Sequence, residues 1–179
     1  GLLFTYLMTY GGAVVALFSP FHGLLIYVAF AILRPPSLWF WSVPPGNYSR
    51  TIAIAMLVGW ALHGFGNWRL GRAGAIVWAF IAYYLWGVLS AATVASNSSI
   101  AWAYVEFMAK ILLPFLVGVS TIDSVDKLRQ LAWTIVLSQG YVCLELNRSY
   151  LDGYNWALDG FGGMGRAVFG AGLVCTLAV

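Results

Sequence analysis

Residues 73–94 read AGAIVWAFIAYYLWGVLSAATV, a stretch without a charged side chain that is rich in small and aromatic residues. The hydrocarbon core of a bilayer is about 30 Å thick and needs about 20 consecutive apolar residues in a helix. Lipid offers no partner to backbone N–H and C=O groups, so such a run must form a helix or a closed barrel. The alternation of apolar and polar residues that is typical of barrel strands is absent. We therefore expect a membrane-spanning helix here.

The composition of the whole chain extends this expectation. Of its 179 residues, 61% are hydrophobic and 8% are charged, whereas about 25% are charged in ordinary soluble domains. Nine basic and six acidic side chains are too few to cover a soluble domain of this length. The composition predicts an integral membrane protein. The net charge of +3 is small and scattered, which excludes the basic stripe of a nucleic-acid-binding protein.

Further apolar stretches predict more helices, at 2–18, 22–33, 51–66, 102–119 and 131–146. Ser19-Pro20 separates the first two, because proline removes a backbone donor and ends a helix. Segment 34–45 is proline-broken and holds Trp39 and Trp41, which is typical of the membrane interface. We expect an all-α fold, a polytopic transmembrane helix bundle with about six spans and the start of another.

The chain ends point to a larger protein. It begins with Gly1 rather than methionine, and residues 171–179 are an apolar run too short to cross a bilayer. We interpret residues 1–179 as one transmembrane domain, the N-terminal part of a longer membrane protein.

Two polar segments are expected to be loops. Segment 121–130 has Ser/Thr and Asp residues that suit a helix N-cap, with Lys and Arg following. Segment 147–170 is long and glycine-rich, and long loops in compact domains are often functional. Short loops weigh most in the positive-inside rule. That rule assigns to the cytoplasmic face Arg69, Arg72, Lys127 and Arg129, and to the opposite face Arg34, Arg50, Arg148 and Arg166.

Glu106 and Lys110 lie four residues apart within a predicted span, so they share one face of the helix. Charged residues inside a span are costly and usually face a bundle interior or an aqueous cavity. One interpretation is an ion pair that fixes helix packing. The other is contact with a substrate or with a lipid phosphate.

Motifs for other chemistry are missing from the sequence. Paired carboxylates, a Cys/His cluster and a nucleophile elbow do not occur, so we predict no metal, no cofactor and no assignable catalytic residue. Cys143 and Cys175 lie in apolar runs and are interpreted as small buried hydrophobic residues. The glycine-rich segment 159–166 resembles a phosphate cradle in composition, but no Gly-Lys-Ser/Thr follows it.

The order of features resembles a known family. A broken first hairpin leads to an Arg-Pro aromatic segment, then to EFMAKILL at 106–113, the turn at 123–129 and the Gly-Phe-Gly-Gly sequence at 160–163. This order resembles the N-terminal half of the O-antigen ligase and polymerase superfamily, particularly its exosortase-associated O-glycosylation ligase branch. The chain departs from the family where Gly165 to Val168 replace asparagines. The large periplasmic loop of the family would lie beyond Val179.

The resemblance implies a bacterial inner-membrane enzyme that moves a glycan from an undecaprenyl-diphosphate carrier onto an acceptor at the periplasmic face. Such transfer needs cations near the diphosphate, and the guanidinium fork of arginine binds phosphate oxygens in pairs. Arg34, Arg148 and Arg166 are the candidates, the last two flanking the glycine-rich segment. The expected partners are membrane lipid, the lipid-linked glycan and other membrane subunits, but not nucleic acid.

Two other functions remain open. The first is a non-enzymatic scaffold subunit of a larger membrane complex, which would fit the aromatic content of 17% and the lack of a sharp motif. The second is a transporter fragment, a class that shows inverted repeats and helices interrupted at mid-membrane.

Overall fold

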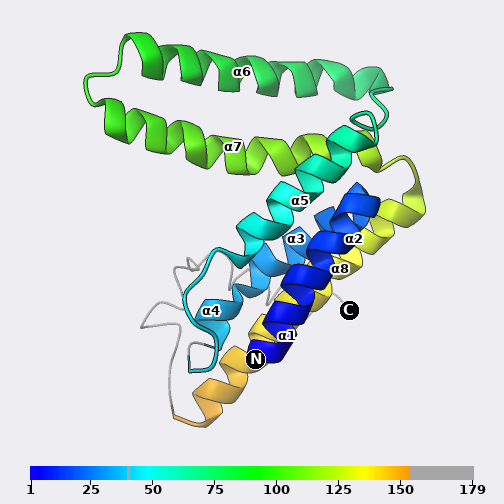
Figure 1. Cartoon of the computed structure of the whole chain (residues 1–179), viewed down its shortest axis with the longest axis vertical. Coiled ribbons are helices and arrows are strands. Elements are labelled where there is room, and N and C mark those ends of the chain that lie inside the picture. Colours follow the sequence, from blue (N-terminus) through cyan, green and yellow to red (C-terminus); the bar gives the residue numbers. More distant parts are fainter. Residues whose placement is uncertain (40, 154–179) are drawn as a thin grey trace.

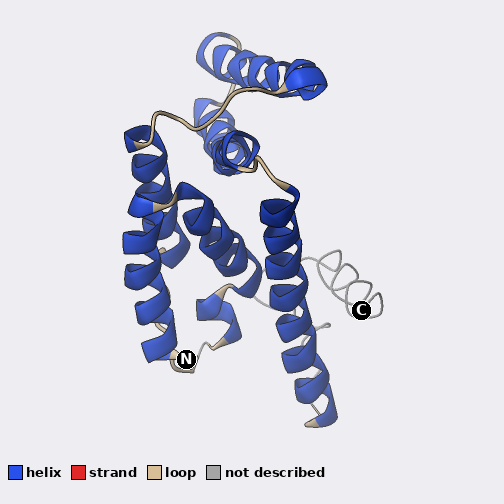
Figure 2. Ribbon diagram, turned by 90° about the vertical axis from the view of Figure 1, so that its right-hand side faces the viewer, coloured by secondary structure: helices blue, strands red, loops and turns tan. Residues whose placement is uncertain are grey.

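The computed structural model describes residues 1–39 and 41–153, which fold into helices joined by turns, without a β-strand in these residues (Figures 1 and 2). The predicted all-α class is confirmed. The elements in chain order are α1 (Leu2–Tyr6), η1 (Leu7–Gly11), α2 (Gly12–Phe18), α3 (Pro20–Leu33), α4 (Pro35–Leu38), α5 (Tyr48–Leu62), η2 (Gly71–Ala73), α6 (Gly74–Thr93), α7 (Ser98–Thr121) and α8 (Val125–Leu151).

The first two apolar stretches form a helical hairpin. α1, the π-helical turn η1 and α2 follow one another without a break from Leu2 to Phe18. Ser19 then takes an extended conformation (φ −143°), and Pro20 is the first residue of α3. The predicted break is thus confirmed. α3 begins two residues earlier than predicted because proline fits the first helical turn, where its missing N–H is not needed.

Helices α2, α3 and α5 pack closely because small residues lie where they meet. Ala16 of α2 is fully buried. A Cβ atom added to Gly23 of α3 would lie 2.6 Å from the Ala16 Cβ, and one added to Gly59 of α5 would collide with the Ala16 carbonyl oxygen. Small residues let helix backbones approach one another. The buried core at this contact consists of Ala16, Leu24, Met56, Trp60 and Val117.

α8 lies against the other side of α3. A second cluster joins Leu38 of α4 to Val142 of α8, both of them buried. Cys143 is also buried in α8, as predicted. α3 therefore occupies the middle of the bundle, with contacts to α2, α5, α7 and α8.

α6 and α7 form a hairpin that runs across the end of the other helices instead of along them (Figure 1). Among the described residues they are the two helices long and apolar enough to cross a membrane, with 20 and 24 residues. Only 11% and 17% of their apolar windows are buried. The core helix of a soluble protein would be mostly buried, whereas most of the surface of α6 and α7 is not covered by the described residues.

The prediction of about six spans holds only for these two helices. α3 has 14 residues, which is about 21 Å at 1.5 Å per residue, and α5 has 15. α8 is long enough with 27 residues, but it is not among the helices apolar enough to cross a membrane. Apolar composition predicted where these helices are, but not how long they are.

Helices extend into both predicted loops. α7 ends at Thr121 and α8 begins at Val125, so only residues 122–124 connect them. Ser124 caps α8 through its side chain, which accepts a hydrogen bond from the Lys127 backbone N–H (3.3 Å). The prediction of a loop at 147–170 is wrong for its first residues, because α8 continues to Leu151. Asp126, Arg129 and Arg148 of α8 are exposed, whereas Lys127 and Glu145 are partly buried and Ser138 and Val142 are buried.

Candidate functional site

A cavity of about 440 Å³ lies where α3 ends and α5 begins. Two short segments of the chain line it, at 27–36 and 45–49, and each contains prolines that turn the backbone sharply. Its lining residues are Tyr27, Phe30, Ala31, Arg34, Pro35, Pro36, Pro45, Gly46, Tyr48 and Ser49. The cavity thus combines one cation and three hydroxyl groups with an apolar wall.

Arg34 occupies an unusual backbone position. It caps α3 in the left-handed region (φ 43°, ψ 68°), which few residues other than glycine adopt. Pro35 follows as the first residue of α4, and a residue before proline is disfavoured in the right-handed helical region. Backbone strain of this kind is concentrated at functional sites. Here it ends α3 and leaves the exposed Arg34 on the cavity wall.

Tyr27 connects the cavity to α7. Its hydroxyl donates a long hydrogen bond (3.5 Å) to the backbone carbonyl of Lys110. In an uninterrupted helix that carbonyl would accept from the N–H of residue 114, but Pro114 has none and lies inside α7. The tyrosine therefore satisfies a carbonyl that the proline leaves without its helical partner.

The predicted ion pair of Glu106 and Lys110 forms on α7. Lys110 Nζ lies 2.8 Å from Glu106 Oε1, and the side chains of Lys110 and Glu106 are 65% and 69% exposed, respectively. Arg50, in the first turn of α5, is close enough for its charge to act on Glu106. Of Arg34 and these three charged residues, only Arg34 lines the cavity.

The predicted site residues are only partly brought together. Arg34 lines the cavity, and Tyr27 links that cavity to the segment of α7 that holds Glu106 and Lys110. Arg148 lies in the last turn of α8, at the same end of the molecule as α4 (Figure 1), but it is not among the residues lining the cavity. Arg166 and the glycine-rich segment 159–166 lie outside the described residues.

Sequence reasoning missed Tyr27, Tyr48 and Ser49 as candidate site residues. Tyr27 lies in a stretch without charges, so the stretch itself offered no reason to expect a polar partner for its hydroxyl. A signal was available in Pro114, since a proline inside a span leaves a carbonyl that needs another donor. Tyr48 and Ser49 follow a proline-rich turn, and no pattern indicates which way they face.

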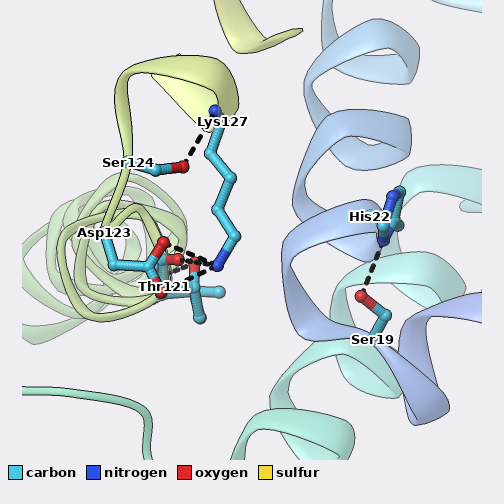
Figure 3. A network of polar contacts seen from close by, with 7 residues as sticks. Ser19, His22, Thr121, Asp123, Ser124 and Lys127 are labelled. Atoms are coloured by element: carbon cyan, nitrogen blue, oxygen red, sulfur yellow. Dashed lines mark hydrogen bonds and ion pairs between the residues drawn. The ribbon is translucent and has the colours of Figure 1, made fainter.

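A second polar cluster lies at the opposite end of α3 (Figure 3). Lys127 Nζ donates to the Thr121 carbonyl (2.9 Å) and to the Asp123 carboxylate (3.0 Å), and it lies 5.5 Å from the ring centre of Phe21. The hydrogen bond from Lys127 lowers the pKa of Asp123. These contacts join the α7–α8 turn to the start of α3, and we interpret the cluster as structural.

The described residues contain no group of three His, Cys, Asp or Glu side chains that could hold a metal ion. No protein-family model matches the chain, and no curated protein and no solved structure matches it either.

Proposed function

We propose that this chain is part of an integral enzyme of the bacterial inner membrane that binds the diphosphate of a polyprenyl-linked glycan and transfers the glycan to an acceptor. The observation that carries the proposal is the cavity at the end of α3, which pairs Arg34 with the hydroxyl groups of Tyr27, Tyr48 and Ser49. The resemblance of the sequence to O-antigen ligases supplies the reaction.

Placement in the membrane is supported first by α6 and α7. Further crossings by the shorter helices belong to the proposal only if the hairpin can turn relative to them, because in this structure it runs across their ends (Figure 1). Large apolar side chains on the first hairpin support this, since Leu3 is 82% exposed, Leu7 68% and Phe18 76%. Contiguous apolar surface of this kind is rare on soluble monomers and marks contact with lipid or a partner.

The chemistry fits the charges. Transfer breaks the bond between the first sugar carbon and the diphosphate, and the leaving diphosphate keeps the electron pair. Cations next to it stabilise the developing negative charge. Arg34 supplies a guanidinium group at the cavity wall, and Ser49 supplies a hydroxyl. The Tyr48 hydroxyl donates to the Pro44 carbonyl (3.1 Å), so it can only accept a further hydrogen bond. The acceptor would attack from the side facing away from these groups.

Ligand binding tests the proposal directly. Purified protein in detergent is mixed with undecaprenyl diphosphate or with undecaprenol, and bound ligand is counted by native mass spectrometry. We expect a preference for the diphosphate, which Arg34→Gln weakens about 10- to 100-fold, since a charge-assisted hydrogen bond contributes about 1.5–3 kcal/mol. Arg34→Lys should lie between the two because it keeps the charge but loses the fork.

The matched control is Arg129→Gln, which removes one cation that is paired with Asp126 on α8 (3.7 Å). It should leave the preference for the diphosphate unchanged. Equal binding of the two lipids by the unmodified protein, or equal losses in Arg34→Gln and Arg129→Gln, would rule the cavity out as the diphosphate site.

A scaffold function is the second candidate, and the hairpin favours it. A cleft of about 230 Å³ runs between α6 and α7, where small residues such as Gly87 and Ala91 lie beside Tyr84 and Trp86. Small residues at helix surfaces allow close packing with another membrane helix. A scaffold predicts stable copurification of a second membrane subunit and no selective binding of the diphosphate lipid.

A further inference from the structure

The connection between α5 and α6 has a tightly fixed backbone. Gly64, Phe65 and Gly66 all lie in the left-handed region, with φ of 71°, 63° and 72°. Phe65 is the unusual member, because residues with a Cβ atom rarely adopt this region. Its backbone N–H donates to the Trp60 carbonyl (2.9 Å), and its ring packs edge-on against Trp60, with centroids 5.1 Å apart.

Ser120, near the end of α7, holds this connection in place. It is 3% exposed, and its hydroxyl accepts a hydrogen bond from Trp60 Nε1 (2.8 Å). Its carbonyl accepts from the Asn67 backbone N–H, also at 2.8 Å. A Cβ atom on Gly66 would lie 2.6 Å from that same carbonyl oxygen. Ser120 therefore accepts two hydrogen bonds, one from Trp60 at the end of α5 and one from Asn67 in the loop, and the backbone of Gly66 passes close to it.

The side chains that this rigid loop presents are apolar and cationic. Leu62 is 75% exposed, Phe65 50% and Trp68 38%. Arg69 follows directly, and it forms no ion pair within the part of the chain that the structure describes. The rings of Phe65 and Trp68 each pack one side against Trp60, with centroids 5.1 and 6.2 Å away, and leave the rest of the side chain exposed. A rigid loop with exposed apolar groups next to a cation fits the boundary between lipid tails and head groups.

The position of the loop agrees with this partner. It leads through η2 into the start of α6, and it is bonded to the end of α7. With 20 and 24 residues, these helices are about 30 and 36 Å long, which matches the thickness of the hydrocarbon core. If both helices cross a bilayer, this junction lies at one surface of it.

We propose that residues 62–69 form an interfacial anchor whose partner is an anionic lipid surface. Leu62, Phe65 and Trp68 enter the head-group boundary, and Arg69 pairs with lipid phosphate. The inference rests on the membrane placement in the proposed function but not on glycan binding. It assigns a lipid contact to a loop at the end of the bundle remote from the Arg34 cavity.

The first test measures how deeply residue 62 lies in the bilayer. In protein whose two cysteines are replaced by alanine, a nitroxide is attached at Leu62→Cys, and its collisions with oxygen and with a water-soluble nickel chelate are compared in nanodiscs. Asp126→Cys is the aqueous control, because this side chain is 83% exposed in the first turn of α8. We expect the label at 62 to favour oxygen and the label at 126 to favour nickel. A preference for nickel at position 62 would overturn the anchor.

The second test measures how the stability of the protein depends on the charge of the lipid. The melting temperature is compared in phosphatidylcholine nanodiscs with and without phosphatidylglycerol. We expect phosphatidylglycerol to raise the melting temperature of the unmodified protein. Arg69→Glu should lose most of this increase, whereas Arg69→Lys and Arg129→Glu should keep it. A full rise in Arg69→Glu, or no rise in the unmodified protein, would contradict the proposal. Both tests leave undecaprenyl diphosphate out, so the anchor and the Arg34 cavity can fail separately.

Discussion

The contact of α2, α3 and α5 and the hairpin of α6 and α7 are built from similar apolar residues but are stabilised differently. In the first, Ala16, Gly23 and Gly59 let backbones touch around a buried core. In the hairpin, Val77 and Ala91 are the buried residues of α6, and most of its surface is exposed. The bundle contact is therefore stabilised by packing within the chain, whereas most of the hairpin surface is not covered by the described residues.

Changing a contact glycine should give the largest effect on this difference. Gly59→Ala places a methyl group against the Ala16 carbonyl, and the adjoining backbone of Leu17 leaves it little room. We expect a loss of about 1–3 kcal/mol in the free energy of unfolding, measured by chemical denaturation in detergent. Gly87→Ala on α6 is the matched control, because nothing lies within 4 Å of the added methyl group. It should be neutral or slightly stabilising, and equal losses would show that the two regions are packed alike.

Removing the Ser120 hydroxyl should give the next largest effect. Ser120→Ala leaves the buried Trp60 Nε1–H without its acceptor, at a cost of about 1–3 kcal/mol. Thr93→Ala on α6 also removes a hydroxyl that bonds to a helix carbonyl (2.8 Å), but an exposed one. It should change the free energy of unfolding by less than about 0.5 kcal/mol. Denaturation curves of both variants decide whether the bundle end or the hairpin is more sensitive.

The contribution of the ion pair on α7 to stability should show whether water or lipid surrounds the hairpin. In water, an exposed pair four residues apart contributes about 0.3–0.5 kcal/mol. In a membrane, a single alanine change leaves an uncompensated charge inside a span. We expect Glu106→Ala and Lys110→Ala each to lower the folded yield, and the double change to recover part of it. A double-mutant cycle in nanodiscs should give a coupling above about 0.5 kcal/mol, and additive losses would contradict this.

The smallest expected effect is a change in stability at acid pH. Lys127 lowers the pKa of Asp123, so the folded state binds a proton there less readily than the unfolded state does. The stabilisation is present above the unfolded pKa of about 3.9 and is lost as the pH falls through the lower, folded value. Asp123→Asn should therefore be slightly less stable than the unmodified protein at about pH 6 and similar to it well below pH 3. Thermal melts across this range test it, and a gap that widens in acid would refute the sign.

Several features were predictable from residues alone. The apolar stretches located the helices, Ser19-Pro20 located the first break, and the spacing of Glu106 and Lys110 predicted their pairing. The Ser/Thr and Asp residues of segment 121–130 also indicated the N-cap that Ser124 provides. The full lengths of α7 and α8 were not predictable from the apolar pattern, because both helices extend through polar residues at their ends. The cavity was missed since its walls come from prolines and tyrosines on separate segments that meet only after folding.

The missing backbone bond between Lys110 and Pro114 divides α7 into two mechanical segments. The C-terminal segment is fastened to the bundle through Ser120, and the N-terminal segment packs against α6. A helix bends most easily where its bond ladder is interrupted, and here the Tyr27 hydroxyl spans the gap. A bend at this point would rotate the α6–α7 hairpin relative to the other helices. Glu106 and Lys110 would then move relative to Arg34, while the Ser120 end of α7 would stay in place.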